Sequence, residues 1–213
     1  MAEMKVFRCD SAGDIASCAA IITEQKGVVV FPTDTIYGIG CDPYSDAAVE
    51  RIFAIKGRSE DKPLPVLVAG MQVAEELVDL GDVGRRLAER FWPGALTIVA
   101  PLVDRKISAS VTASRKESLA VRVPANRCAL ALLQECRCLV GTSANLSGGK
   151  PSSTAEQVLQ QSGLRGYDAL LADDRPLGGR ESTIVDITTG AKPTIVRHGA
   201  VSAGDIDAAL AGT

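Results

Sequence analysis

Residues 11–40 read SAGDIASCAAIITEQKGVVVFPTDTIYGIG, and this stretch places a helical pattern, an apolar run and a polar turn in succession. Apolar residues recur at helical spacing between Ile15 and Ile22, which predicts a helix from about Ser11 to Lys26. The β-branched run Val28–Phe31 that follows predicts a buried strand. A helix followed at once by a buried strand is the unit from which α/β proteins are built.

The alternation of helices and strands continues along the rest of the chain. Further strands are expected at 65–68, 96–100, 119–123, 139–140, 169–172, 183–187 and 194–196. Further helices are expected at 46–56, over 71–91 with a break at Gly81, at 126–136, after a capping box of Thr154 and Gln157, and after Ser202. Neither a repeat nor a linker interrupts this order, so we expect a single α/β unit over residues 1–213.

Composition excludes several classes of protein. The chain has 213 residues, a formal net charge of −3, 46% hydrophobic residues and 4% aromatic residues. A chain of this length buries roughly 70% of its unfolded surface, so its stability requires no disulfide or metal. The longest uncharged stretch, Phe91–Val103, is too short to cross a membrane, and Met1–Asp10 lacks the pattern of a leader sequence. We therefore expect a cytoplasmic protein without a membrane partner.

The cysteines and the histidine narrow the chemistry further. The six cysteines include no CxxC pair and several lie among apolar residues, which favours structural thiols over a zinc site. His198 is the one histidine in the chain, so catalysis based on histidine has a single candidate. We therefore expect any reaction catalysed here to depend on Lys, Arg and carboxylate side chains and on the positioning of the substrates.

Polar and basic side chains gather in the segments next to the predicted strands. Each has an ordinary alternative explanation: a polar turn, a solvated helix end or the exposed face of a strand. Ligands of α/β sheets bind where strand ends meet, however, and cations with hydroxyls suit phosphate oxygens. Taken together these side chains predict a site for an anionic substrate such as a nucleotide. They lie in turn 32–40, at Lys56, Arg58 and Lys62, at Arg122, in loop 141–150, and at Arg197.

Seven short sequence blocks are distributed along nearly the whole chain. They are FPTDTIYG at 31–38, KGR at 56–58 with KPL at 62–64, WPG at 92–94, VRVP at 121–124, SANLSG at 143–148, ESTIVD at 181–186 and RHG at 197–199. In content and order they resemble the YrdC-like family of threonylcarbamoyl-AMP synthases, in its single-domain form. The resemblance implies a twisted, mixed, open α/β sheet with helices packed on it, curved around a basic concave cavity.

The resemblance also implies an activity. Such an enzyme, a nucleotidyltransferase, forms L-threonylcarbamoyl adenylate and pyrophosphate from L-threonine, bicarbonate and ATP with Mg²⁺. The product serves the downstream machinery that makes threonylcarbamoyladenosine at position 37 of tRNA. Because the carbamate formed from threonine is itself the nucleophile, the reaction needs charge neutralisation and alignment more than a protein nucleophile. That requirement agrees with the abundance of cations and the scarcity of histidine.

Matching the family motifs onto this chain implies two groups of site residues. Lys56 and Arg58 are expected to be catalytic, and Arg122 is expected to pair with the carboxylate of threonine. The ligands of Mg²⁺ are not assigned from the sequence. The resemblance assigns Arg58, Lys62, Ser118, Asn145, Thr154 and Arg197 to ATP, with Lys56 also on the triphosphate, and it assigns Thr35, Arg122, Ser143 and Ser182 to L-threonine.

Two other functions remain open from the sequence. One is an RNA-binding module that takes double-stranded RNA or tRNA in the same basic cavity. The net charge of −3 and the 4% of aromatic residues disfavour it, because RNA surfaces are usually basic and stack bases on aromatic rings. The other is a carbamoyl-adenylate module like the related domain of hydrogenase maturation proteins, which normally sits within a much longer chain.

Overall fold

The strands of the protein form two mixed sheets. A computed structural model describes residues 4–113, 115, 117–175, 177–189 and 192–211. Within these residues a five-stranded sheet has the order β1-β9-β2-β3-β8, and a six-stranded sheet has the order β11-β10-β5-β6-β4-β7. The strands are β1 (Lys5–Arg8), β2 (Val29–Phe31), β3 (Gly38–Gly40), β4 (Val66–Val68), β5 (Leu96–Pro101), β6 (Ser118–Arg122), β7 (Cys138–Val140), β8 (Thr142–Ser143), β9 (Ala169–Ala172), β10 (Thr183–Asp186) and β11 (Thr194–Arg197).

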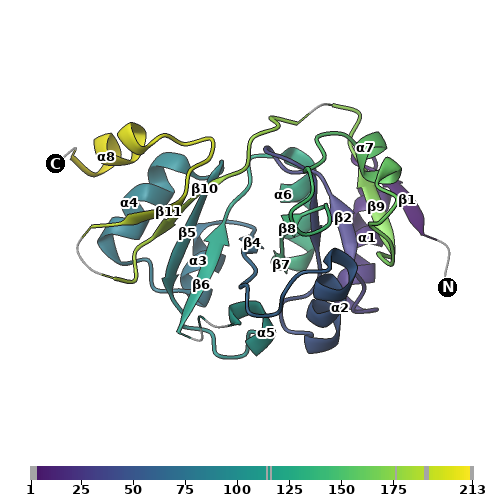
Figure 1. The fold of residues 1–213 in the computed structure, drawn as a ribbon, viewed down its shortest axis with the longest axis horizontal. Helices are drawn as coiled ribbons and strands as arrows, with labels where there is room; N and C mark the ends of the chain where they lie inside the picture. Colours follow the sequence, from purple (N-terminus) through teal and green to yellow (C-terminus); the bar gives the residue numbers. More distant parts are fainter. Residues whose placement is uncertain (1–3, 114, 116, 176, 190–191, 212–213) are drawn as a thin grey trace.

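The two sheets occupy the two halves of an elongated molecule, with the described ends of the chain at opposite ends (Figure 1). The chain passes from the six-stranded to the five-stranded sheet at Gly141, between β7 and β8. The sheets also meet where Gly40 faces Val140: a Cβ atom on Gly40 would lie 1.9 Å from the Val140 carbonyl oxygen. Only glycine permits so close an approach, so the edge of one sheet lies directly against the other.

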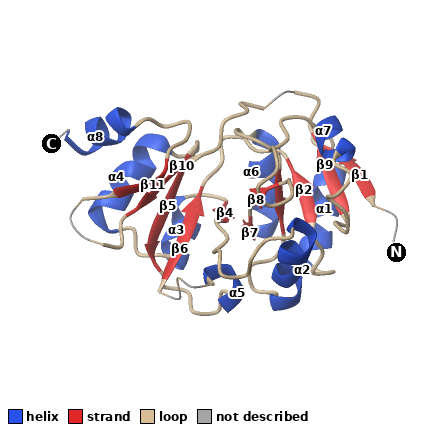
Figure 2. Ribbon diagram, viewed as in Figure 1, coloured by secondary structure: helices blue, strands red, loops and turns tan. Residues whose placement is uncertain are grey.

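Helices cover the outer faces of the sheets (Figure 2). Helix α1 packs on β1, β2 and β9 and lies beside α6, whereas α4 packs on β5 and lies beside α8. None of the described helices has the length and apolar character that a bilayer crossing requires. The helices are α1 (Ala12–Thr23), α2 (Asp46–Lys56), α3 (Met71–Leu77), α4 (Gly81–Phe91), α5 (Ala109–Thr112), α6 (Arg127–Cys136), α7 (Ala155–Gln160) and α8 (Ala203–Ala211).

Polar side chains cap the N-termini of several of these helices. The sequence places the cap of α2 at Asp46, which is wrong by one residue, because the Ser45 side chain accepts from Ala48 N. The Ser11 hydroxyl accepts a hydrogen bond from Asp14 N at 3.2 Å, and Thr154 Oγ1 accepts one from Gln157 N at 3.2 Å. The return bond of the predicted capping box is shifted by one residue, because Gln157 Oε1 accepts from Ser153 N at 2.8 Å instead of from Thr154 N. The cap residue itself is therefore confirmed, and the reciprocal contact is not.

The α/β class and the mixed strand directions are confirmed. The strands form two hydrogen-bonded sheets where one was expected, because β7 and β8 are separated by a single glycine but pair with different neighbours. Strands β1, β3 and β8 and helix α5 were not predicted. β3 has the sequence Gly-Ile-Gly, and β8 is two residues long, so neither carries a strand pattern of its own.

Candidate functional site

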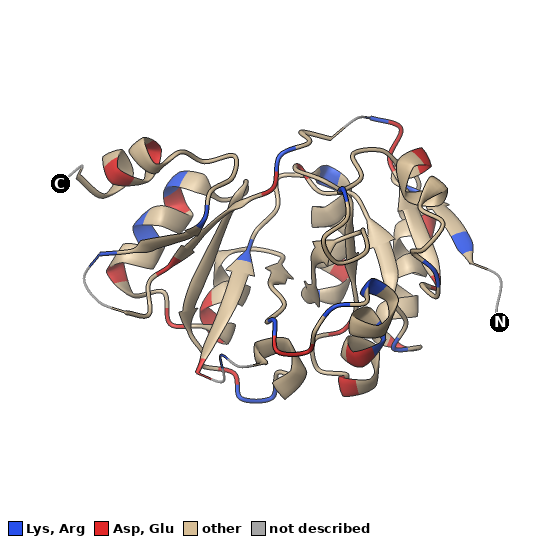
Figure 3. Cartoon of the chain, in the orientation of Figure 1, with Lys and Arg blue, Asp and Glu red and all other residues tan. Residues whose placement is uncertain are grey.

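A cavity of about 420 Å³ lies between the two sheets. Strands β3 and β8 supply one wall, and β5, β6, β10 and β11 supply another. Figure 3 shows basic positions at the end of β6 and just after α2, among acidic positions spread over the helices. Eight of the eleven residues predicted from the sequence line this cavity, namely Thr35, Arg58, Lys62, Ser118, Arg122, Ser143, Ser182 and Arg197.

Arg122 is a buried cation in the wall of the cavity. Its side chain is 6% exposed, and its Nη2 lies 2.6 Å from Asp34 Oδ1. The same guanidinium donates from Nε to the Gly94 carbonyl at 2.8 Å and from Nη1 to Thr35 Oγ1 at 3.2 Å. Burial lowers the pKa of Arg122, and the Asp34 carboxylate opposes that shift. The guanidinium is thus held rigidly beside the hydroxyl of Thr35.

Ser182 and Arg197 form a second polar group in the cavity. Arg197 Nη2 donates to Ser182 Oγ at 3.0 Å and to the Ser182 carbonyl at 2.9 Å, while Nη1 lies 3.0 Å from Glu181 Oε1. The Ser182 hydroxyl is also 2.9 Å from Thr97 Oγ1. Strands β10 and β11 pair antiparallel, which brings the end of β11 next to the residue that precedes β10. This pairing explains why the two predicted residues meet.

Arg58 brings a partly unsatisfied guanidinium to the cavity. It follows Gly57, which ends α2 in the left-handed conformation at φ 56° and turns the chain toward Pro63. Arg58 Nη2 donates to the Pro63 carbonyl at 3.0 Å, whereas its buried Nε has no hydrogen-bond partner among the described residues. Burial lowers the pKa of Arg58, and nearby Arg197 adds to the shift. An anionic oxygen in the cavity would satisfy the Nε donor.

Three of the predicted residues do not line the cavity. Lys56 is 2% exposed and donates to the backbone carbonyls of Ser143 and Asn145. Asn145 Nδ2 donates to the carbonyls of Leu146 and Gly149 at 2.7 and 2.8 Å, so the amide closes its own loop. Thr154 caps α7. In this structure these three side chains contact the protein itself.

Several lining residues were not singled out as ligands from the sequence. Arg115 lines the cavity and makes a 2.6 Å ion pair with Asp186, while Thr97 and Glu181 border Ser182 and Arg197. The Arg115 segment carries no strand or helix pattern that would place it. Glu181 lies within the ESTIVD block, and its place in that block is the sequence feature from which it could have been predicted as a site residue.

The described residues contain no group of three or more His, Cys, Asp or Glu side chains able to hold a metal ion. Glu181 is the one carboxylate among the lining residues of the described chain.

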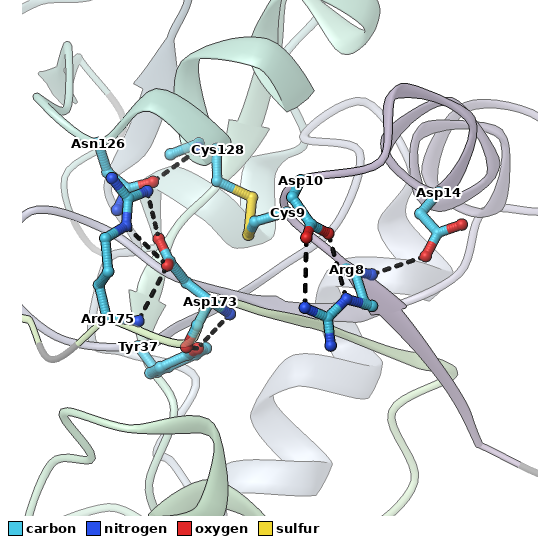
Figure 4. Close-up of a disulfide and its surroundings, with 10 residues drawn as sticks. Arg8, Cys9, Asp10, Asp14, Tyr37, Asn126, Cys128, Asp173 and Arg175 are labelled. Carbon is cyan, nitrogen blue, oxygen red and sulfur yellow. Dashed lines mark hydrogen bonds and ion pairs between the residues drawn. A yellow bond between two sulfur atoms is a disulfide. The ribbon is translucent and has the colours of Figure 1, made fainter.

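A disulfide joins Cys9 to Cys128, at an S–S distance of 2.08 Å and a separation of 119 residues. Figure 4 shows it beside Asn126, the cap of α6, and beside Asp173. The backbone of Asp173 contacts the Tyr37 hydroxyl, which accepts from Asp173 N at 2.9 Å. Tyr37 lines the functional cavity. The expectation of structural thiols is therefore corrected for this pair: Cys9 and Cys128 meet because α1 and α6 pack side by side, a contact that cysteine spacing does not encode.

Comparison with known proteins identifies the family. The sequence model of the Sua5/YciO/YrdC family, described as "Telomere recombination", matches residues 22–199. The chain belongs to this family. Its likeness extends beyond the seven blocks, which together make up a minority of the matched residues.

Curated relatives carry consistent names. The chain is 39% identical over 200 residues to the threonylcarbamoyl-AMP synthase of Bacillus subtilis, covering 92% of this chain and 56% of that protein. It is 38% identical over 197 residues to the putative threonylcarbamoyl-AMP synthase of Mycobacterium tuberculosis H37Rv, covering 90% and 86%. The chain thus spans little more than half of the first relative and most of the second.

Solved structures share the fold. Sua5 of Pyrococcus abyssi complexed with L-threonine superposes with a TM-score of 0.89 at 30% identity, covering 99% of this chain and 61% of that one. YciO of E. coli superposes with a TM-score of 0.83 at 23% identity, covering 97% and 100%, a likeness of fold alone. The YrdC-like fold implied by the sequence blocks is confirmed.

Proposed function

We propose that the protein is a threonylcarbamoyl-AMP synthase, which converts L-threonine, bicarbonate and ATP into L-threonylcarbamoyl adenylate and pyrophosphate. The observation that carries the proposal is the combination of two kinds of side chain in one cavity. Arg122, Thr35 and Ser182 suit the carboxylate and hydroxyl of an amino acid, and Arg58 and Arg197 suit phosphate oxygens. The names of the relatives, and the threonine complex of Sua5, support the same activity over an RNA-binding module.

The chemistry needs no nucleophile from the protein. The amine of threonine attacks the carbon of bicarbonate or CO₂ and forms a carbamate, with loss of water in the case of bicarbonate and of a proton to solvent in the case of CO₂. A carbamate oxygen then attacks the α-phosphorus of ATP, the P–O bond to the β-phosphate breaks, and pyrophosphate leaves with the bonding electrons. Catalysis consists of holding the carbamate in line with the leaving group and neutralising charge as it builds on the phosphates.

The residues of the cavity divide into two subsites under this proposal. Arg122 holds the threonine carboxylate with the hydroxyls of Thr35, Ser143 and Ser182 nearby. Arg58 and Arg197 neutralise the phosphates. Lys62 and Ser118, which also line the cavity, complete the nucleotide subsite. Mg²⁺ enters as part of the nucleotide substrate and adds positive charge on the departing pyrophosphate.

The proposal extends to the setting of the reaction. We assign the product to the downstream machinery that modifies position 37 of tRNA, and we assign the protein to the cytoplasm, where that machinery would act on tRNA.

Pyrophosphate release tests the proposal. The purified protein is given ATP and Mg²⁺, with L-threonine or bicarbonate omitted in turn and with L-serine as the control amino acid. We expect release only when both L-threonine and bicarbonate are present, together with a threonylcarbamoyl adenylate detected by mass spectrometry. Release that ignores the amino acid supplied, or no release at all, would mean that the fold serves another substrate.

A further inference from the structure

Lys56, the last residue of α2, makes three hydrogen bonds to the end of β8 and to the loop that follows it. Its Nζ donates to the Ser143 carbonyl and, at 2.7 Å, to the Asn145 carbonyl. Its own backbone carbonyl accepts a hydrogen bond from Ser147 N at 2.8 Å. The end of the helix therefore holds the backbone of residues 143–147.

The environment of Lys56 differs from that of a phosphate-binding lysine. The residue is 2% exposed and is absent from the described residues that line the cavity, although Arg58 and Ser143 line it. A buried ammonium group is costly unless acceptors surround it, and the two carbonyls supply that need. Burial lowers the pKa of Lys56 to about 8.

The loop held by Lys56 carries a predicted threonine ligand. Ser143 pairs through β8 with Gly38 of β3 and is one of the residues that line the cavity. Asn145 closes the following turn through its side-chain amide, so the loop has little freedom once its start is fixed. Losing the ammonium group would take the Lys56 donor away from the Asn145 carbonyl, and it would leave the Ser143 carbonyl with the Asn145 N–H at 3.0 Å as its donor among the described residues. The link between the end of α2 and this backbone would then rest on the Ser147 N–H alone, so the backbone would be held less firmly.

We infer that Lys56 is a positioning residue: it fixes the loop 143–147 so that Ser143 faces L-threonine, while Arg58 meets the phosphates. The inference rests on the proposed function for the identity of the ligand. It assigns to Lys56 an effect on the amino-acid subsite, whereas a lysine bound to the triphosphate would affect the nucleotide subsite alone.

Binding of L-threonine in the absence of nucleotide separates the two roles. Calorimetry would compare the wild type with Lys56→Met and with the matched variant Arg58→Met. We expect Lys56→Met to weaken threonine binding at least tenfold and Arg58→Met to leave it unchanged. An unchanged threonine affinity in Lys56→Met, with loss of binding only for inorganic tripolyphosphate, would overturn the inference.

Two further measurements do not depend on turnover. Amide hydrogen exchange in residues 143–149 should be faster in Lys56→Met than in Arg58→Met, and equal rates would contradict the inference. If Lys56→Met does not fold, the wild type labelled with ¹⁵N-lysine and with ¹³C at the backbone carbonyls decides the matter. Couplings across hydrogen bonds from Lys56 Nζ to the backbone carbonyl carbons are expected when tripolyphosphate is bound, and a coupling to phosphorus instead would refute it. Failure of the pyrophosphate assay alone would count against the proposed function and not against this contact.

Discussion

Arg122 and Asp34 form a buried ion pair in the wall of the cavity, with Nη2 and Oδ1 2.6 Å apart across 88 positions of sequence. Asp34 Oδ1 also accepts a hydrogen bond from Ala125 N at 3.0 Å, so the carboxylate is fixed as well as the guanidinium. The pair holds Arg122 in one orientation before any substrate binds. A substrate carboxylate would then meet a pre-oriented cation and lose less entropy on binding.

Replacing Arg122 should affect threonine far more than ATP. We expect Arg122→Ala to raise the KM for L-threonine about tenfold or more, because hydrogen bonds to charged groups are worth about 1.5–3 kcal/mol. Steady-state kinetics with each substrate varied in turn measures the effect, and circular dichroism checks the fold. A rise in the KM for ATP with no change for threonine would show that the two subsites are exchanged.

Arg115 should contribute to nucleotide binding. It lines the cavity, and among the described residues its guanidinium has the one side-chain contact to Asp186, so Arg115→Met is expected to raise the KM for ATP about tenfold. Arg105→Met is the matched control, because Arg105 forms an exposed ion pair with Glu117 and does not line the cavity. An equal KM for ATP in the two variants would show that Arg115 does not contribute to nucleotide binding.

The contact between the sheets at Gly40 should tolerate no side chain. Gly40→Ala places a Cβ atom 1.9 Å from the Val140 carbonyl oxygen, and neither backbone can move without disturbing its sheet. We expect a loss of about 3 kcal/mol in the free energy of unfolding, measured by denaturant titration. Gly70→Ala serves as the control, since a Cβ atom there has no neighbour within 4 Å. Equal stabilities of the two variants would mean that the sheets are less tightly joined than the structure has them.

The Cys9–Cys128 disulfide should stabilise the fold. It closes a loop of 119 residues, for which the loss of chain entropy in the unfolded state corresponds to about 3–5 kcal/mol. Both cysteines line a second cavity of about 520 Å³, through which a small dithiol can reach them. Guanidinium titrations with and without dithiothreitol should differ by that amount in the wild type but not in Cys9→Ser, and Cys136→Ser should behave as the wild type. A dithiothreitol effect that persists in Cys9→Ser would assign it to other thiols.

The sequence by itself determined most of the helices and strands and eight of the residues that line the cavity. Apolar periodicity and capping residues located α1, α6, β2 and β5 to within a few residues, because those signals act between neighbours in the chain. The resemblance to the family predicted eight of the lining residues, and seven of these lie within the quoted blocks.

Tertiary structure alone decided how those residues are used. The division into two sheets at Gly141, the disulfide and the burial of Lys56 all arise from contacts between segments that are distant in sequence. The residues next to Lys56 in the chain, Gly57 and Arg58, suggest that this lysine binds phosphate. Whether its ammonium group meets a phosphate or two backbone carbonyls depends on which loop packs against the end of α2, and local sequence preferences contain no information about that packing.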